Sequence, residues 1–271
     1  MTGRLEGKVA IVTGSSRGLG QYCAFAYARE GAKVVIAART QQDSERLPGT
    51  IYDSVAQIED RGGQAMAVVC NVADPDSVQA MTDEVLQKWG QIDVVMANAG
   101  ILPGGGVSTM QLRHFELEFR VNVVGAFYTL RSALPSMLER GTGSLITISS
   151  GAADPGRSGH YAATKRAVEA MTVGMADELK DTGIAVNCLK PTSSIRTAGA
   201  IFRRTPAERA EYKGLTPESY EEAAILLALQ TPATCTGAVF TDAQAVKALG
   251  SAEDLSRFKA LYPASWAESI S

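Results

Sequence analysis

Short apolar runs alternate with longer helical patterns along most of this 271-residue chain, and this alternation constrains the fold more than any other feature. The runs are rich in Val, Ile and Ala, and several are apolar at successive positions rather than at every second one. Strands with that pattern are buried on both faces, as in a parallel sheet that helices cover on each side. The sequence therefore predicts an α/β fold, with a doubly wound parallel sheet and helices on both faces.

Seven segments have the length and composition of strands, and six have the pattern of helices. The predicted strands are 8–13, 33–38, 65–70, 93–97, 144–149, 185–189 and 238–240. The predicted helices are 18–30, 51–61, 75–89, 110–138, 159–180 and 217–230. Pro75 and Pro217 suit the first turn of a helix, whereas Pro135 is expected to bend or end the long pattern over 110–138. Two loops remain, 41–50 and about 192–215, and the second is the better candidate for a mobile lid over a substrate.

The bulk composition is that of an ordinary globular protein, with 45% apolar and 20% charged residues, and we expect one domain over residues 1–271. The net charge is only −3 and the Lys and Arg residues are scattered, which argues against nucleic acid as a partner. The first residues lack the apolar core of a signal peptide, and no apolar stretch reaches the roughly 18 residues of a membrane span. We therefore expect a cytoplasmic protein without membrane association.

The cysteines and histidines do not form a recognisable metal site or disulfide framework. The four cysteines are far apart and form no CxxC pair, and the chain has two histidines. These residues are Cys23, Cys70, Cys188, Cys235, His114 and His160. The cysteines are expected to be buried packing residues or free thiols, and no metal is predicted.

The segment VAIVTGSSRGLG predicts a site for a dinucleotide phosphate. It leads a buried strand into Gly14, Gly18 and Gly20 and then into a helix, in a GxxxGxG spacing. Glycines allow a tight turn and a close approach of the backbone to a phosphate, and the helix N-terminus offers free N–H groups. A plain strand-to-helix turn is the alternative, but the position after the first strand favours nucleotide binding.

The end of the second predicted strand bears on which dinucleotide is bound. Ala38 stands where a carboxylate would accept a hydrogen bond from the ribose of NAD(H), and Arg39 follows it. Arg17, in the glycine turn, could reach the same position. Since a 2′-phosphate needs cationic partners, we expect NADP(H) rather than NAD(H).

Tyr161 and Lys165 are four residues apart in a predicted helix, so their side chains lie on one face about 6 Å apart along the axis. An adjacent ammonium stabilises a phenolate, which suits a tyrosine for proton transfer. Ser149 and Ser150 end the fifth predicted strand, at the sheet edge where doubly wound folds bind ligands. Asn122 lies among apolar residues of a helix, where a carboxamide needs hydrogen-bond partners; it either holds a water of a proton relay or is structural.

These motifs together resemble the short-chain dehydrogenase/reductase family. TGSSRGLG, ANAG over 97–100, Asn122, the Ser149-Ser150 pair and YAATK occur in the family's order and approximate spacing, and the resemblance extends to about residue 245. The insert LPGTIYDSVAQIEDRGGQA, with GMADELK and IAVNCLKPTSSIRT, is similar to the hydroxysteroid dehydrogenase-like subgroup, a name that does not fix the substrate. The resemblance implies a single Rossmann-type oxidoreductase domain.

The resemblance also implies a set of site residues. The second serine of the pair usually aligns with the catalytic one, so Ser150 is chosen, with Ser149 as the alternative because the gap to Tyr161 is short. The implied catalytic residues are Ser150, Tyr161, Lys165 and Asn122. The implied cofactor-binding residues are Gly14, Ser16, Arg17, Gly18, Leu19, Gly20, Arg39, Asn71, Val72, Asn98, Ala99, Gly100, Tyr161, Lys165, Pro191, Ile195 and Thr197. Three positions depart from the family pattern: Asn71 stands in place of Asp, Ala97 in place of Asn, and Thr192 in place of Gly.

The predicted activity is hydride transfer between NADP(H) and a ketone or secondary alcohol, with a catalytically silent dinucleotide-binding regulator as the alternative. A small hydrophobic carbonyl or alcohol substrate is expected, because the residues predicted to flank the pocket are apolar. These residues are Ile101, Leu102, Ala152, Pro155, Ile195 and Phe202. His160 either enters the site or faces solvent. Arg203 and Arg204 are candidates to bind an anionic tail of the substrate.

Two further expectations concern assembly and the C-terminus. The family resemblance implies a homo-oligomer, a tetramer or a dimer, formed through the long helices that begin near Met110 and Gly159. The amphipathic tail over about 251–271 is expected to dock on its own subunit, close the pocket or reach a neighbouring subunit.

Overall fold

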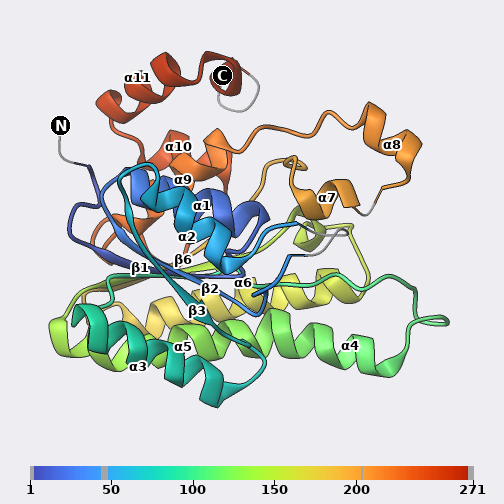
Figure 1. The fold of residues 1–271 in the computed structure, drawn as a ribbon, viewed down its shortest axis with the longest axis horizontal. Coiled ribbons are helices and arrows are strands. Elements are labelled where there is room, and N and C mark those ends of the chain that lie inside the picture. The colour runs from blue at the N-terminus through green and yellow to red at the C-terminus, as the bar shows by residue number, and fades with distance from the viewer. Residues whose placement is uncertain (1–2, 44–47, 203, 268–271) are drawn as a thin grey trace.

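The computed structural model describes residues 3–43, 48–202 and 204–267. Within them, a seven-stranded sheet runs through the centre of the molecule (Figure 1). Its strands are β1 (Val9–Thr13), β2 (Lys33–Ala38), β3 (Gln64–Val69), β4 (Val94–Ala97), β5 (Gly143–Ile148), β6 (Ile184–Lys190) and β7 (Val239–Thr241). They lie in the order β3-β2-β1-β4-β5-β6-β7, and every neighbouring pair is parallel.

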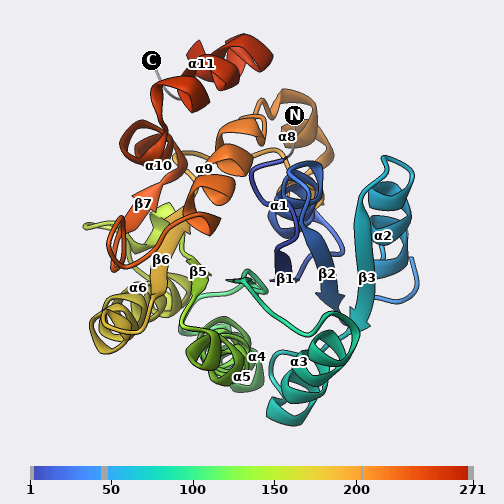
Figure 2. The same cartoon turned by 90° about the vertical axis from the view of Figure 1, so that its left-hand side faces the viewer.

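Helices cover both faces of the sheet (Figure 2). One layer contains α1 (Gly18–Arg29), α2 (Ile51–Glu59), α9 (Glu218–Ala228) and α10 (Asp242–Leu249). The other contains α3 (Pro75–Trp89), α4 (Leu112–Phe119), α5 (Gly125–Arg140) and α6 (His160–Leu179). Successive residues of a strand point to opposite faces, and so Val34 and Ile36 of β2 pack into the first layer while Val35 and Ala37 pack into the second. This explains why the strands are apolar at consecutive positions.

The strand order creates a crevice at the carboxyl edge of the sheet. After β1 the chain continues to β2 and β3 on one side, and it then crosses to β4 on the other side of β1. The connections that follow β1 and β4 therefore diverge. Ligands of doubly wound sheets bind at such a point, and the glycine turn after β1 and the segment after β4 both lie there.

The predicted doubly wound parallel sheet is confirmed, and its seven strands begin and end within one residue or two of the predicted bounds.

The 110–138 helix differs from the prediction. A π-helical turn over Arg120–Val124 separates α4 from α5, and α5 continues through Pro135 to Arg140. The helix does not end at Pro135, which was one of the two outcomes predicted there. Pro135 and Arg131, whose carbonyl loses its partner, are both exposed, so water can satisfy that carbonyl.

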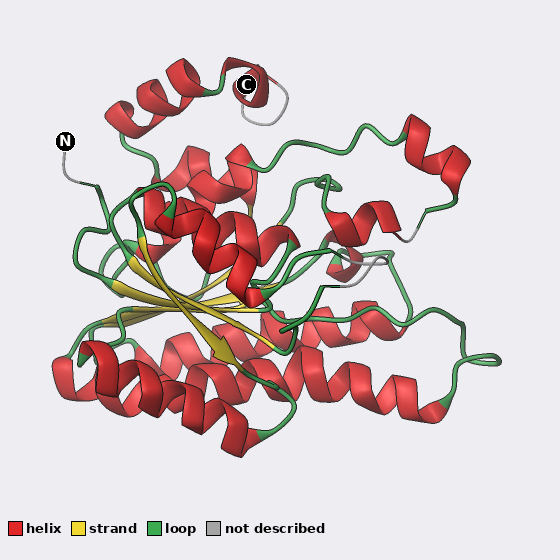
Figure 3. Ribbon diagram, in the orientation of Figure 1, coloured by secondary structure: helices red, strands yellow, loops and turns green. Residues whose placement is uncertain are grey.

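Residues 192–215 contain more regular structure than a loop. They form α7 (Ala198–Phe202) and α8 (Pro206–Glu211), visible beside the sheet edge in Figure 3, and an isolated bridge joins Ile195 to Leu215. Pro217 is the N-cap of α9 rather than a residue of its first turn. In the other predicted loop, 41–50, residues 44–47 lie outside the described part of the chain.

The C-terminal segment packs on its own subunit as α11 (Ala252–Leu261) and α12 (Pro263–Ser265). Phe258 is buried in the core layer that contains α1 and α9. The guanidinium of Arg4 contacts the carboxylates of Glu30, Glu222 and Asp254, and so ties the N-terminal residues to α9 and α11. In the described part of the chain, no helix combines the length and the apolar character that a membrane span requires.

Candidate active site

A cleft of about 1360 Å³ opens at the carboxyl edge of the sheet. It is lined by segments that follow β1, β2, β3, β4, β5 and β6 and by the first turns of α6. Of the residues predicted for the cofactor, all line it except Gly20. The structure therefore brings residues from all along the first two hundred positions of the sequence to one side of the sheet.

The glycine turn after β1 has the geometry of a phosphate cradle. Gly14 and Gly18 adopt φ angles of +68° and +66°, which L side chains rarely adopt. Gly20 lies behind the turn, and a Cβ there would come within 2.3 Å of Asn98 Nδ2. Gly20 is therefore needed for close packing of α1 rather than for contact with the cleft.

Asn98 connects this turn to the end of β4. Its Nδ2 donates to the carbonyl oxygens of Thr13 at 2.8 Å and Gly14 at 3.3 Å, and its own backbone N–H donates to Thr13 Oγ1. These bonds hold the two diverging strand ends together at the crevice. Asn98 thus fixes the floor of the cleft at the point where the strand order reverses.

Basic residues lie at the β2 side of the cleft. Arg39 is exposed at the end of β2 and lines the cleft, as does Arg17. Arg17 Nη2 donates to the Gly49 carbonyl at 2.6 Å, while its buried Nε has no hydrogen-bond partner among the described residues. Asn71, at the end of β3, accepts from the Ala73 N–H through Oδ1. A phosphate and an adenosine would thus meet cationic and polar groups there.

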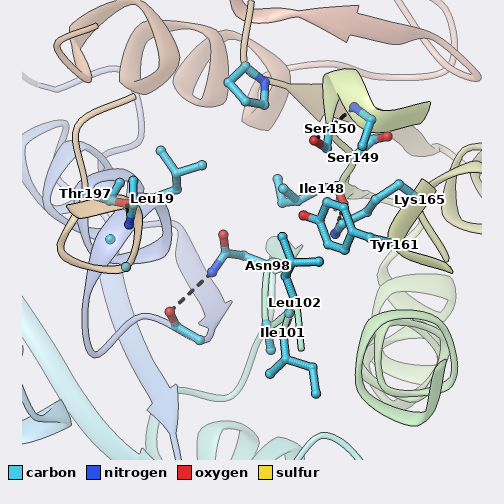
Figure 4. A pocket seen from close by; sticks show the side chains of 18 of the residues that line it. Leu19, Asn98, Ile101, Leu102, Ile148, Ser149, Ser150, Tyr161, Lys165 and Thr197 are labelled. Carbon is cyan, nitrogen blue, oxygen red and sulfur yellow. Dashed lines mark hydrogen bonds between the residues drawn. The ribbon is translucent and has the colours of Figure 1, made fainter. Parts of the chain in front are cut away.

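Tyr161 and Lys165 lie side by side on the first turns of α6, and Figure 4 shows both within the cleft below Ser149 and Ser150. Lys165 Nζ donates to the Ile148 carbonyl at 2.8 Å and lies 5.6 Å from the centre of the Tyr161 ring. Burial, partly offset by negative charge that includes Glu118, lowers the pKa of Lys165 to about 8. The pair thus supplies a phenol beside an ammonium.

The two serines after β5 differ in what their hydroxyls contact. Ser149 is buried and donates to Glu169 Oε1 at 2.6 Å. Ser150 accepts from the Ala152 N–H at 3.2 Å and caps the short 3₁₀ helix Gly151–Ala153. Both residues line the cleft. The Ser149 hydroxyl hydrogen is already used within the protein.

Asn122 lies in the π turn, is buried, and does not line the cleft. Its Oδ1 accepts from the Ile101 N–H at 2.8 Å, and its Nδ2 donates to the Ile101 carbonyl at 2.9 Å and to Thr164 Oγ1 at 3.2 Å. The carboxamide is therefore fully hydrogen-bonded, and it fixes the backbone of a residue that does face the cleft.

Most of the predicted substrate residues line the cleft; Pro155 does not. Arg204 lies 3.5 Å over the centre of the Tyr212 ring and donates to the Ala200 carbonyl, so its guanidinium is engaged within the 192–215 segment. Arg203 lies outside the described residues. His160 neither lines the cleft nor faces solvent freely, because its ring contacts Glu118 and the Gly105 carbonyl.

Sequence reasoning missed three charged residues that support the site. Glu169 accepts from Ser149, Lys190 lies 3.5 Å from Glu169 and 2.6 Å from Asp154 of the cleft wall, and Glu118 contacts His160. For the two glutamates, the sequence contained a usable signal in their helical spacing from a site residue. Glu118 is one helical turn before Asn122, and Glu169 is one turn after Lys165, so each lies on the face that carries a site residue.

Comparisons with known proteins agree with this geometry. The family model described as short chain dehydrogenase matches residues 8–204. An uncharacterised NAD-dependent oxidoreductase of Mycobacterium tuberculosis is 36% identical, over 70% of this chain and 73% of that protein. Hydroxysteroid dehydrogenase-like protein 2 of Danio rerio is 32% identical, over 73% of this chain and 48% of that longer protein.

Solved structures show the same fold. A short chain dehydrogenase from Mycobacterium thermoresistibile superposes with a TM-score of 0.81 at 29% identity, over 91% of this chain and 89% of that one. A metagenomic short-chain oxidoreductase in complex with NADP superposes with a TM-score of 0.71 at 28% identity, over 88% of this chain and 97% of that one. The chain therefore belongs to the short chain dehydrogenase family, and it is an oxidoreductase that acts on alcohol or carbonyl groups with a nicotinamide dinucleotide.

Proposed function

We propose that this protein uses NADP(H) to interconvert an apolar ketone and the corresponding secondary alcohol. The observation that carries the proposal is that Tyr161, Lys165 and Ser150 line the same cleft as the glycine turn. When bound, the nicotinamide supplies or accepts the hydride at the carbon that bears the oxygen. The residues of this chain bind that oxygen and move its proton.

Tyr161 is the proposed acid and base. In the direction of reduction its phenol gives a proton to the substrate oxygen, and in the direction of oxidation its phenolate takes that proton back. The Lys165 ammonium, 5.6 Å from the ring centre, stabilises the phenolate. With a pKa of about 8, Lys165 is mostly charged at neutral pH and can supply that field.

Ser150 is the proposed donor to the substrate oxygen. Its Oγ already accepts from the Ala152 N–H, which leaves its hydroxyl hydrogen for a substrate in the cleft. Ser149 is less suited, since its hydroxyl donates to Glu169. Asn122 is a proposed positioning residue that acts through Ile101 and Thr164.

The residues at the glycine turn fit a dinucleotide with a 2′-phosphate. The turn provides backbone N–H groups at the start of α1, and the buried Arg17 Nε lacks a partner among the described residues. Arg39 adds a second cation at the end of β2. We infer a preference for NADP(H), although the Mycobacterium tuberculosis relative is named for NAD.

The substrate end of the cleft favours a hydrophobic or weakly polar molecule. Apolar side chains from the segments after β4, β5 and β6 line this end. They are Ile101, Leu102, Ala152, Ile195 and Phe202. The proposed substrate is therefore a small carbonyl compound or alcohol with an apolar body.

We also propose that residues 1–271 act as one domain within a homo-oligomer. Large apolar side chains are exposed on α4 and α5, which replace the predicted 110–138 helix, and on α6. They are Leu112, Phe115, Leu117, Phe127 and Leu138 on α4 and α5, and Val173 on α6. Burial of this surface between copies would remove it from water.

The test is consumption of NADPH with a panel of apolar ketones and diketones, comparing the wild type with Tyr161→Phe. The variant should bind NADPH with wild-type affinity and lose at least about a hundredfold in turnover, because the phenol proton is gone. Tyr52→Phe, a change at a half-exposed tyrosine of α2, is the control and should keep full activity. Wild-type binding of NADPH without turnover on any compound would instead indicate a silent dinucleotide-binding protein.

A further inference from the structure

His160 directly precedes Tyr161 and links the start of α6 to two other segments. Its Nδ1 lies 2.5 Å from Glu118 Oε2 on α4, and its Nε2 lies 3.2 Å from the Gly105 carbonyl oxygen. The Glu118 side chain is fully buried and that of His160 is 19% exposed. The imidazole therefore joins α6, α4 and the segment 101–111, with its Glu118 contact buried and its Gly105 contact at the surface.

Both partners of this imidazole are hydrogen-bond acceptors. Neutral imidazole donates through one nitrogen only, so it cannot satisfy a carboxylate and a carbonyl at once. The pair of His160 and Glu118 meets both contacts when it holds two protons. These protons lie either on the imidazolium, or on one imidazole nitrogen and the carboxylic acid. Loss of one proton leaves one contact as two acceptors without a hydrogen between them.

The segment 101–111 is a wall of the cleft with few other attachments. Ile101 and Leu102 line the cleft, and PGGG over 103–106 offers little side-chain packing. Among the described residues, hydrogen bonds tie this segment to other elements at three points. Ile101 bonds to Asn122, Gly105 bonds to His160, and the Gln111 carbonyl accepts from two amides at the start of α4. The hydrogen bonds of Gly106, Thr109 and Met110 stay within the segment.

We propose that His160 is a positioning residue that, paired with Glu118 and sharing two protons with it, holds the 101–111 segment in place as the wall that contacts the substrate. This inference rests on the function proposed above, since it assigns a substrate to that wall. The consequence is that removal of either side chain of the pair detaches the segment from α4 and α6.

Other ionisable groups within one or two turns of the pair lie on α4 and α6. His114 lies one turn before Glu118 on α4, and on α6 Tyr161 follows His160. The Lys165 ammonium, one turn further along α6, is stabilised by the Glu118 charge. The segment 101–111 has no titratable side chain. Because the chain has two histidines, His114 provides a matched control.

Hydrogen–deuterium exchange tests the attachment without any need for turnover. Exchange of the amides over 104–110 is measured on the intact protein at about pH 7. His160→Gln and Glu118→Leu should exchange at least about fivefold faster than the wild type, while His114→Gln should exchange at the wild-type rate. Equal exchange in all four proteins would overturn the proposal.

Kinetics separate this inference from the proposed function. In His160→Gln and Glu118→Leu the KM for an apolar ketone should rise about fivefold or more, with kcat and the Kd of NADPH within about twofold of the wild type. A fall in kcat at unchanged KM would contradict a role in holding the wall. A wild type that turns over no carbonyl compound refutes the proposed function, whereas the exchange result judges the attachment.

Discussion

Lys165 is almost completely buried beside Tyr161, and its charge state should control the pH dependence of the reaction. Burial lowers the pKa of this lysine to about 8, so the ammonium, which we propose stabilises the Tyr161 phenolate, is present below that pH and is lost as the pH rises through it. We expect kcat/KM for ketone reduction to decline above about pH 8. A profile recorded with saturating NADPH from about pH 6 to about pH 10 measures this. A rate that stays level across that range would show that the ammonium has no such role.

Arg39 should discriminate between the two dinucleotides. It is exposed at the end of β2, so its replacement should leave the fold intact while it removes the proposed cationic partner of the 2′-phosphate. In Arg39→Ala we expect the Kd of NADPH to rise by about tenfold or more and that of NADH to change by less than about twofold. Titration of the protein with each cofactor, monitored by fluorescence, gives both dissociation constants. Equal effects on the two cofactors would contradict the assignment.

For single residues, the sequence predicted the position of a site residue where helical spacing alone determines it. The separation of Tyr161 and Lys165 placed both side chains on one face, and both line the cleft. The choice between Ser149 and Ser150 depends on Glu169, which contacts Ser149 from α6 in a way that no local pattern reveals. The partners of His160 lie 42 and 55 residues away, so its role could not be read from its neighbours.

Among the elements, the docking of α11 depends on Arg4. Its guanidinium lies 2.9 Å from both Glu30 Oε1 and Asp254 Oδ1 and also contacts Glu222, and the two glutamates are nearly buried. In Arg4→Met these carboxylates lose a cation, and we expect the free energy of unfolding to fall by about 3–5 kcal/mol. Urea unfolding measures the loss. Lys180→Met, at an exposed ion pair, is the control and should not change the midpoint.

The same cluster predicts how the docking responds to acid. Burial alone would raise the pKa of Glu30, but hydrogen bonds from Arg4 lower it below its ordinary value. A carboxyl whose pKa is lower in the folded state stabilises that state above its unfolded pKa, and the contribution is lost as the pH falls through the folded pKa. The destabilisation in Arg4→Met should therefore shrink in acid, below about pH 4. A difference that does not depend on pH would contradict this origin.

The sequence predicted which segments form strands and which form helices, but it did not predict where a helix is interrupted. Strands such as β2 and β5 followed directly from runs of buried apolar residues. The π turn over Arg120–Val124 has no marker in composition, and the partner of its Asn122, the Ile101 backbone, lies 21 residues away. The helix continues through Pro135 because that face is exposed, and exposure follows from packing.

For the whole molecule, the alternation of strands and helices was enough to predict the layers, and the reversal of strand order at β1 and β4 makes the crevice. Gly14, Asn98 and Tyr161 come from distant parts of the chain and meet there. The sequence does not decide among three placements of the C-terminal segment. In the structure this segment packs through Phe258 and contacts Arg4, 250 residues before Asp254.

The most direct test of the central claim is a single turnover with NADPH that carries deuterium on the transferred C4 position. We predict that the wild type, mixed with an apolar ketone, gives the secondary alcohol with deuterium on the carbinol carbon, and that the alcohol hydroxyl takes its proton through Tyr161. Tyr161→Phe should bind the same labelled cofactor and give no labelled alcohol on that timescale. Oxidation of the cofactor without label on that carbon, or an undiminished rate in the variant, would contradict the account.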